Sequence, residues 1–275
     1  MIGVALLILG GEWLVRGASR LGQAARVSPL VAGLTIVAFA TSAPEFAVSV
    51  RAALSGDVSL AVGNVTGSNI ANIGLILGLS ALAGPLHVPP QLARFDVRVM
   101  VGLFLVMWAL GVDSIFTLWE GVALLLALVL YLGALITAAR RIELLVDPEP
   151  AFATFTRRQI MLSAALTAAG LILLILGADR LVEGASDLAR HLGVSDRIIG
   201  LTVVAIGTSL PELAASVVAT LRGEREIAVG NVIGSNVFNI LGVLGATAVA
   251  APTGLTTVAQ TLSLDFPVMI AAGLA

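Results

Sequence analysis

The sequence predicts an all-α integral membrane protein, an inverted-repeat (5+5) helix bundle with about nine transmembrane helices present and a tenth missing. Three observations predict this class. Of the 275 residues, 58% are hydrophobic and 12% are charged, and the mean hydropathy is +1.05, whereas a soluble domain is about a quarter charged. Nine apolar stretches follow one another, most of them near the ~20 residues that cross a bilayer. The two halves of the chain also repeat each other in register.

Short polar joints separate the apolar stretches, so each stretch is a candidate transmembrane helix. If the N-terminus lies outside, eleven arginines fall in cytoplasmic joints and four in external joints. Because positive residues concentrate on the cytoplasmic side, we expect a multi-pass protein with an external N-terminus. The nine stretches span residues 1–15, 29–54, 58–83, 97–112, 117–139, 160–182, 197–221, 226–251 and 263–275.

Charge and cysteine content exclude several classes of function. The net charge of −2 gives no reason to expect a nucleic-acid partner. The absence of cysteine excludes disulfides, thiol catalysis and cysteine-ligated zinc. Neither a resident cofactor nor a protein partner is indicated by any motif, so the lipid bilayer is the expected surrounding partner.

The longest joint separates two halves of the chain. It contains Asp147-Pro148-Glu149-Pro150, a polar run that breaks a helix. We therefore expect a first half over 1–139, a cytoplasmic linker over 140–158 and a second half over 159–275.

An internal duplication is the strongest signal in the sequence. An offset of 167 residues places 33–82 over 200–249 without a gap, and 28 of the 50 positions are identical. An odd number of helices per half turns the copies upside down relative to each other, as in many secondary transporters, whose site lies between the copies. By the same offset, 97–112 matches 264–279, and 117–139 has no counterpart, so we expect a truncated ten-helix protein.

The first duplicated motif places an acid within the membrane. Thr41-Ser42-Ala43-Pro44-Glu45 is mirrored by Thr208-Ser209-Leu210-Pro211-Glu212. Each proline lacks an N–H and kinks its helix, which turns nearby backbone carbonyls and hydroxyls toward a central cavity. Carboxylate, hydroxyl and carbonyl oxygens suit Ca²⁺ and Na⁺. The carbonyls expected there belong to Ala38, Thr41, Ala205 and Thr208.

Two buried acids need a compensating positive charge. An acidic residue at mid-membrane costs about 2.5–3.5 kcal/mol on the gentlest scale. The chain has no lysine, and no arginine lies at mid-stretch near Glu45 or Glu212, so a bound cation or a proton must supply the charge. The alternative is that each glutamic acid is protonated and hydrogen-bonds neighbouring helices together.

The second duplicated motif supplies neutral oxygens. Asn64, Ser68 and Asn72 are spaced i, i+4, i+8 and share one helix face, and Asn231, Ser235 and Asn239 repeat this pattern. We expect Ser68, Ser235, Asn72 and Asn239 to be ligands. The flanking glycines allow close helix packing. The remaining asparagines of the motif are expected to bond backbone at helix bends: Asn64, Asn69, Asn231 and Asn236.

Both motifs occur twice in the same order, and in this the chain resembles the sodium/calcium exchanger family of the cation/calcium antiporter superfamily. The resemblance implies a site between helices 2, 3, 7 and 8, and exchange of Ca²⁺ for Na⁺ as helices 1 and 6 slide against a core. It implies that Glu45 and Glu212 are shared central ligands. The flanking sodium-site hydroxyls are then Ser42, Ser68, Ser209 and Ser235. Some relatives carry Asp where this chain has Asn239.

The predicted function is therefore a secondary antiporter that works by alternating access in a prokaryotic inner membrane, not an enzyme. The nearest alternative is a Ca²⁺/H⁺ or K⁺-dependent exchanger. Gly-Ser-Asn in both copies, in place of the Gly-Asn-x-x-Glu-His pattern of the proton-coupled branch, favours sodium. A membrane hydrolase would need a nucleophile with a base, or an aspartate pair, and a scaffold would not need duplicated acids.

Overall fold

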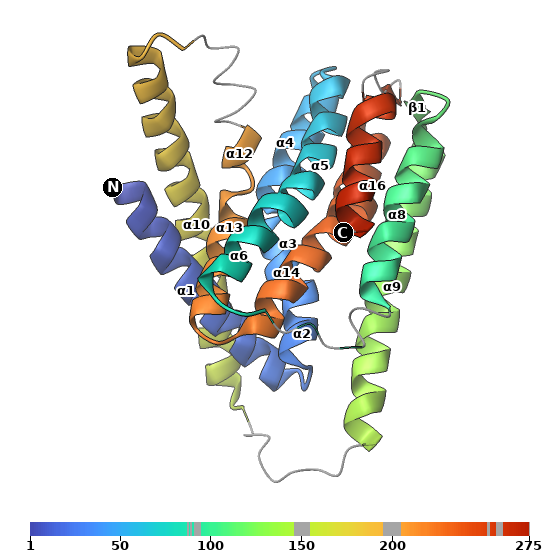
Figure 1. Ribbon diagram of the computed structural model, residues 1–275. Coiled ribbons are helices and arrows are strands. Elements are labelled where there is room, and N and C mark those ends of the chain that lie inside the picture. Colours follow the sequence, from blue (N-terminus) through green and yellow to red (C-terminus); the bar gives the residue numbers. More distant parts are fainter. Residues whose placement is uncertain are drawn as a thin grey trace.

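The computed structural model describes residues 1–86, 88, 90, 95–145, 155–194, 205–251, 254–256 and 261–274, without the side chains of 140–145 and 205. This part of the chain is a bundle of long helices (Figure 1). Within it, a single antiparallel ladder pairs β1 (Ile115–Phe116) with β2 (Leu255–Thr256). The predicted all-α class is confirmed.

The first half contains ten helical elements among the described residues, two of them π-helical turns. They are α1 (Ile2–Ala24), α2 (Pro29–Ala32), η1 (Gly33–Val37), α3 (Ala38–Thr41), α4 (Ala43–Leu54), α5 (Val58–Ala71), η2 (Asn72–Leu77), α6 (Gly78–Ala83), α8 (Asp96–Gly111) and α9 (Leu118–Leu145). The elements from α2 to α4 form one segment that bends by 45° after α3. The elements from α5 to α6 form another continuous segment.

The second half repeats this order. Its described elements are α10 (Arg157–His191), α12 (Ala205–Gly207), α13 (Leu210–Leu221), α14 (Arg225–Phe238), η4 (Asn239–Leu244), α15 (Gly245–Ala250), η5 (Thr261–Asp265) and α16 (Phe266–Leu274). The bounds of α4, α5, η2 and α6 recur 167 residues later in α13, α14, η4 and α15. The duplication therefore extends to the π-helical turns η2 and η4.

Local sequence signals explain where the central helices begin and end. Pro44 and Pro211 lie in the first turns of α4 and α13, where a missing N–H leaves no hydrogen bond unmade. Each of these helices ends two residues before a glycine. Gly56 and Gly223 have φ values of +83° and +80°, a conformation that favours glycine. Asp57 then caps α5 by accepting from the Leu60 N–H.

Five helical segments of the described chain are long and apolar enough to cross a membrane, or six when the bent segment of 29–54 is included. Each of the nine predicted stretches contains one of these segments or a shorter helix, such as α8, α13 or α16. Some helices run past the predicted limits, because helical hydrogen bonding continues outside the apolar layer. Thus α1 extends to Ala24, and α10 covers Arg157–His191.

Helical residues extend into both ends of the predicted linker of 140–158. Helix α9 continues to Leu145 and α10 begins at Arg157, while 146–154, with the Asp-Pro-Glu-Pro run, lie outside the described residues. The division into 1–139, 140–158 and 159–275 stays a prediction. So does the inverted relation of the halves, although α1 and the matching α10 run in opposite directions where they pack together (Figure 1).

The segment from α14 to α15 lies at the centre of the bundle. Its apolar window is 89% buried, against 17% for the outer helix α9. Close backbone packing makes this possible, since a Cβ at Gly230 would lie 2.6 Å from the Leu30 carbonyl oxygen. The predicted packing role of Gly230 and Gly234 is confirmed, whereas Gly63 and Gly67 meet no described atom within 4 Å.

Helix α1 is tied to α13 by charge as well as by packing. Glu12 of α1 pairs with Arg16 at 3.0 Å and with Arg222, the residue after α13. Ser19 Oγ lies 3.4 Å from a carboxylate oxygen of Glu224. These contacts connect the first helix to the turn between α13 and α14.

Candidate metal centre

The two predicted acids occupy equivalent places in the fold. Glu45 and Glu212 lie in the first turns of α4 and α13, one residue after Pro44 and Pro211. Each side chain is 1% exposed. The unpaired N–H groups of a helix N-terminus favour negative charge nearby, so the proline-started helices help to stabilise both carboxylates.

Crossed hydrogen bonds join each acid to the opposite half of the chain. Ser42 Oγ donates to Glu212 Oε1 at 3.2 Å, and Ser209 Oγ donates to Glu45 Oε1 at 3.3 Å. Ser209 Oγ also lies 3.4 Å from Ser68 Oγ. The two acids therefore face a shared polar centre, and neither is isolated among aliphatic side chains.

A second pair of contacts holds the acid-bearing helices in place. Asn64 Nδ2 donates to the Glu45 carbonyl at 3.3 Å and to Ser49 Oγ at 2.9 Å. The second half repeats this arrangement: Asn231 Nδ2 donates to the Glu212 carbonyl at 3.4 Å and to Ser216 Oγ at 2.9 Å.

The backbone contacts expected for Asn64 and Asn231 are confirmed, and Asn236 likewise donates to the Val232 carbonyl at 2.8 Å. The expectation for Asn69 is wrong, because Asn69 Oδ1 accepts from the Asn239 side chain.

The two halves differ in how much of the structure around the predicted carbonyl ligands is described. The Ala38 carbonyl oxygen accepts from the Ser42 N–H at 3.0 Å and from Thr41 Oγ1 at 3.4 Å. Thr41 Oγ1 also lies 3.2 Å from Asn231 Oδ1, so it links the two halves. Thr208 follows α12 within the described chain. Ala205 opens α12 directly after 195–204, which lie outside the described residues.

Several buried polar atoms of the predicted ligands have no hydrogen-bond partner in the described part of the chain. A buried polar group without a partner costs about 1–3 kcal/mol, and a charged one costs more. A cation between the two acids would satisfy these oxygens. The unpartnered ligand atoms are Glu45 Oε2, Glu212 Oε2, Ser235 Oγ, Asn239 Oδ1, and both Oδ1 and Nδ2 of Asn72.

The ligand chemistry fits a hard cation. Carboxylate, amide and hydroxyl oxygens suit Ca²⁺ and Na⁺ and are poor ligands for zinc or copper. Among the described residues, no group of three or more His, Cys, Asp and Glu lies together. The centre therefore combines two carboxylates with neutral oxygens.

Sequence reasoning missed Ser49, Ser216 and Asp96, which are among the buried polar residues of the described chain. Ser49 and Ser216 are identical at the 167-residue offset, so the repeat could have identified them. Asp96, at the start of α8, accepts from the Tyr131 hydroxyl of α9 at 3.0 Å. Because its partner in the described part of the chain is Tyr131 of the neighbouring helix, Asp96 belongs to the contact between α8 and α9.

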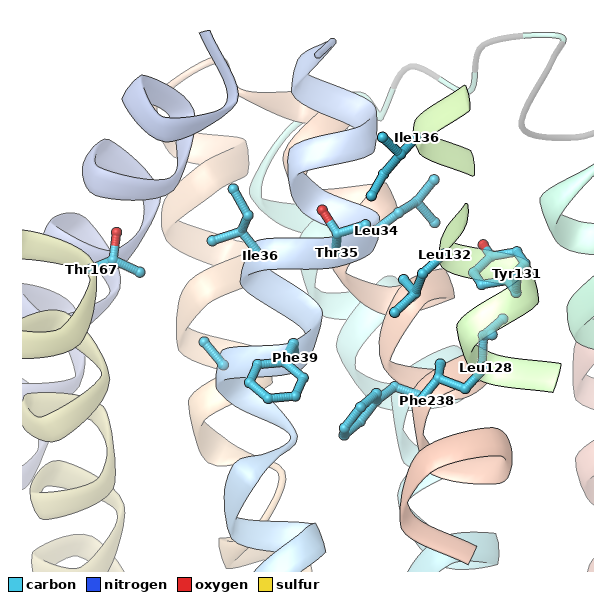
Figure 2. A pocket seen from close by; sticks show the side chains of 13 residues that line it. Leu34, Thr35, Ile36, Phe39, Leu128, Tyr131, Leu132, Ile136, Thr167 and Phe238 are labelled. Atoms are coloured by element: carbon cyan, nitrogen blue, oxygen red, sulfur yellow. The ribbon is translucent and has the colours of Figure 1, made fainter. Parts of the chain in front are cut away.

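A pocket of about 410 Å³ lies between η1, α9 and α14, apart from the acids. Figure 2 shows Leu34, Phe39 and Phe238 around it. The polar side chains in its lining are those of Thr35, Tyr131 and Thr167. The rings of Phe39 and Phe238 meet edge to face with centroids 5.1 Å apart. No carboxylate lines this pocket, so it is separate from the cation centre.

Comparisons with known proteins show which family this chain is similar to. The family model described as sodium/calcium exchanger protein matches residues 1–137 and 162–275. The putative antiporter CaxA of Alkalimonas amylolytica is 38% identical over 100% of this chain and 86% of its own length. The sodium/calcium exchanger MaX1 of Methanosarcina acetivorans is 31% identical over 100% of this chain and 88% of its own length.

Two further comparisons concern location and fold. The inner membrane protein YrbG of Escherichia coli is 36% identical over 98% of this chain and 84% of its own length. A solved structure of the sodium-calcium exchanger NCX_Mj, soaked with 10 mM Na⁺ and zero Ca²⁺, superposes with a TM-score of 0.85 at 32% identity. That superposition covers 99% of this chain and 86% of that one.

Proposed function

Because the chain belongs to the sodium/calcium exchanger protein family, we propose that it carries Ca²⁺ in exchange for Na⁺, binding both between Glu45 and Glu212. The family and the matching fold make it a multi-pass membrane antiporter of cations and a transporter, not an enzyme. The choice of ions and the ligand set are the proposal.

The crossed contacts of the two acids carry this proposal. Each acid uses Oε1 to accept a serine hydroxyl from the other half, while each Oε2 is buried with no partner among the described residues. Two buried carboxylate oxygens without partners repel each other, and no solvent stabilises their charge. A divalent cation, or monovalent cations in overlapping positions, would remove both costs.

The proposed ligand set follows from what each residue contributes. The two glutamates supply the charge, and the hydroxyl, amide and backbone oxygens complete the coordination shell. Asn239 supplies a neutral oxygen where some relatives have Asp, so the centre holds two carboxylates. The full set is Glu45, Glu212, Thr41, Thr208, Ser42, Ser209, Ser68, Ser235, Asn72, Asn239, Ala38 and Ala205.

Exchange follows from the cost of an empty centre. Carrying two uncompensated carboxylates past an apolar gate is expensive, so the transporter changes conformation with Ca²⁺ or Na⁺ bound. If three Na⁺ move against one Ca²⁺, one charge crosses per cycle, and the membrane potential contributes about 2.3 kcal/mol per 100 mV. The direction of net Ca²⁺ movement then depends on the sodium gradient and the potential.

The test is ⁴⁵Ca²⁺ uptake into vesicles that contain the purified chain and are loaded with Na⁺. We expect an outward Na⁺ gradient to drive uptake, and choline in place of internal Na⁺ to abolish it. Vesicles with the E45Q variant and protein-free vesicles are the controls. Uptake that is indifferent to the sodium gradient rejects sodium exchange, and uptake driven by a pH gradient instead supports the proton-coupled alternative.

A further inference from the structure

We propose that Asn69 positions the ion ligand Asn239, and that the thioether of Met269 sets the orientation of Asn69. The three side chains come from α5, η4 and α16, and their exposed fractions are 0%, 1% and 0%. The inference rests on the proposed function, because it concerns an oxygen of the proposed cation centre.

Two hydrogen bonds connect the three residues in a row. Asn239 Nδ2 donates to Asn69 Oδ1 at 3.2 Å. Asn69 Nδ2 donates to Met269 Sδ at 3.7 Å. Asn239 Oδ1 is buried with no partner among the described residues, so it is the end of the row that remains available to a cation.

The chemistry of the thioether gives the row its direction. A methionine sulfur accepts hydrogen bonds and cannot donate them, so Asn69 must turn its Nδ2 toward Met269. The Oδ1 of Asn69 then faces Asn239, so Asn239 must donate a hydrogen bond to it from Nδ2. Asn239 is thereby held with Oδ1 turned away from Asn69 and unpartnered among the described residues. Without the sulfur, both carboxamides could rotate by half a turn, and Asn239 would present N–H groups that repel a cation.

The other half of the chain provides a natural comparison. At the 167-residue offset, the counterparts of Asn69, Asn239 and Met269 are Asn236, Asn72 and Gly102. Gly102 has no side chain to accept a hydrogen bond. Asn236 Nδ2 donates to its own helix instead, at the Val232 carbonyl, and the Asn72 carboxamide has no partner in the described part of the chain.

The two ligand amides are therefore unequal. Asn239 is oriented before an ion arrives, while Asn72 must be ordered by the ion itself. Orienting a ligand in advance reduces the entropy lost on binding. We expect Asn239 to contribute more to cation affinity than Asn72, although both have the same side chain.

The test is a double-mutant cycle of Met269 and Asn69. Two quantities are measured for each variant: the Ca²⁺ concentration that gives half-maximal ⁴⁵Ca²⁺ uptake, and the maximal uptake rate. M269L removes the acceptor and keeps the volume. It should raise the half-maximal concentration about fivefold, as loss of one neutral hydrogen bond predicts, with the maximal rate nearly unchanged. M107L is the matched control, since Met107 is equally buried in α8.

The N69D background distinguishes an effect through the two hydrogen bonds from an effect of packing around Met269. A carboxylate accepts from Asn239 Nδ2 with either oxygen, so M269L should change Ca²⁺ affinity little when N69D is already present. If M269L has the same effect in both backgrounds, Met269 acts by packing and the proposal is wrong.

A readout without ions keeps this result distinct from failure of the proposed transport. In ¹⁵N–¹H spectra of the cation-free, detergent-solubilised chain, the Asn239 carboxamide signal, identified by its loss in N239D, should shift in M269L and stay in place in M107L. If the signal does not move in M269L, Met269 does not orient Asn69 and Asn239, and the proposal is wrong whether or not the parent chain transports Ca²⁺.

Discussion

Replacing one acid of the pair with its neutral isostere should affect Ca²⁺ much more than Na⁺. In E212Q, the glutamine keeps the size of the side chain, and its Oε1 can still accept from Ser42, which lies 3.2 Å from the carboxylate in the parent chain. The fold should therefore survive. What is lost is one negative charge beside the proposed ion.

The magnitude follows from Coulomb's law. A divalent ion about 2.4 Å from a carboxylate oxygen gains about 14 kcal/mol at an effective dielectric constant near 20. Solvation differences offset a large share of this energy. If a third survives, about 5 kcal/mol, Ca²⁺ affinity falls more than a thousandfold. A monovalent ion loses half as much energy, so Na⁺ affinity should fall by about the square root of that factor.

The assay is equilibrium binding of ⁴⁵Ca²⁺ and ²²Na⁺ to the purified chain, for E45Q and E212Q separately. E120Q is the control, because Glu120 lies at the start of α9 in an exposed hydrogen bond with Thr117. Circular dichroism and gel filtration check the fold. Ca²⁺ affinity within tenfold of the parent in both folded variants would refute the charge argument.

Three further predictions concern packing, the polar centre and topology. G230A should destabilise the chain by about 1–3 kcal/mol, because the new Cβ would lie 2.6 Å from a backbone oxygen of α2, while thermal unfolding of G63A, its counterpart, should shift little. N231A removes the amide that donates to the buried Ser216 hydroxyl and accepts from Thr41, and it should lower the unfolding temperature in the same assay. Because the chain has no cysteine, impermeant maleimide on intact cells should label D113C and not R157C, and the reverse pattern would reject an external N-terminus.

The central helices could be predicted because the sequence contains them twice. The repeated Pro44 and Pro211, with the glycines at the ends of the same helices, determine where α4 and α13 begin and end. The π-helical turns were not predicted, since a π-turn inserts one residue into an apolar helix and leaves the hydrophobic pattern readable as ordinary helix. The bounds of η2 and η4 nevertheless match at the 167-residue offset.

The candidate centre was predicted as a set of residue types, and its connections were not. The motifs predict that Ser42 and Ser209 lie near the acids, but they do not predict that each serine bonds the acid of the opposite half. Such crossed contacts depend on how two copies pack against each other. The role of Met269 was hidden for the opposite reason: its counterpart is Gly102, so a search for matched residues passes over it.

Helix α1 is joined to the turn after α13 by the ion pair of Glu12 and Arg222, each about 30% exposed. At the 167-residue offset, Glu12 corresponds to Asp179, whereas Arg222 corresponds to Ser55. The mirror arrangement, with α10 against the end of α4, would therefore lack this charge pair. A partly exposed pair contributes up to about 1 kcal/mol, which is roughly a fivefold preference. The ion pair therefore stabilises the packing of α1 against the end of α13, and the repeat provides no equivalent pair for α10 and the end of α4.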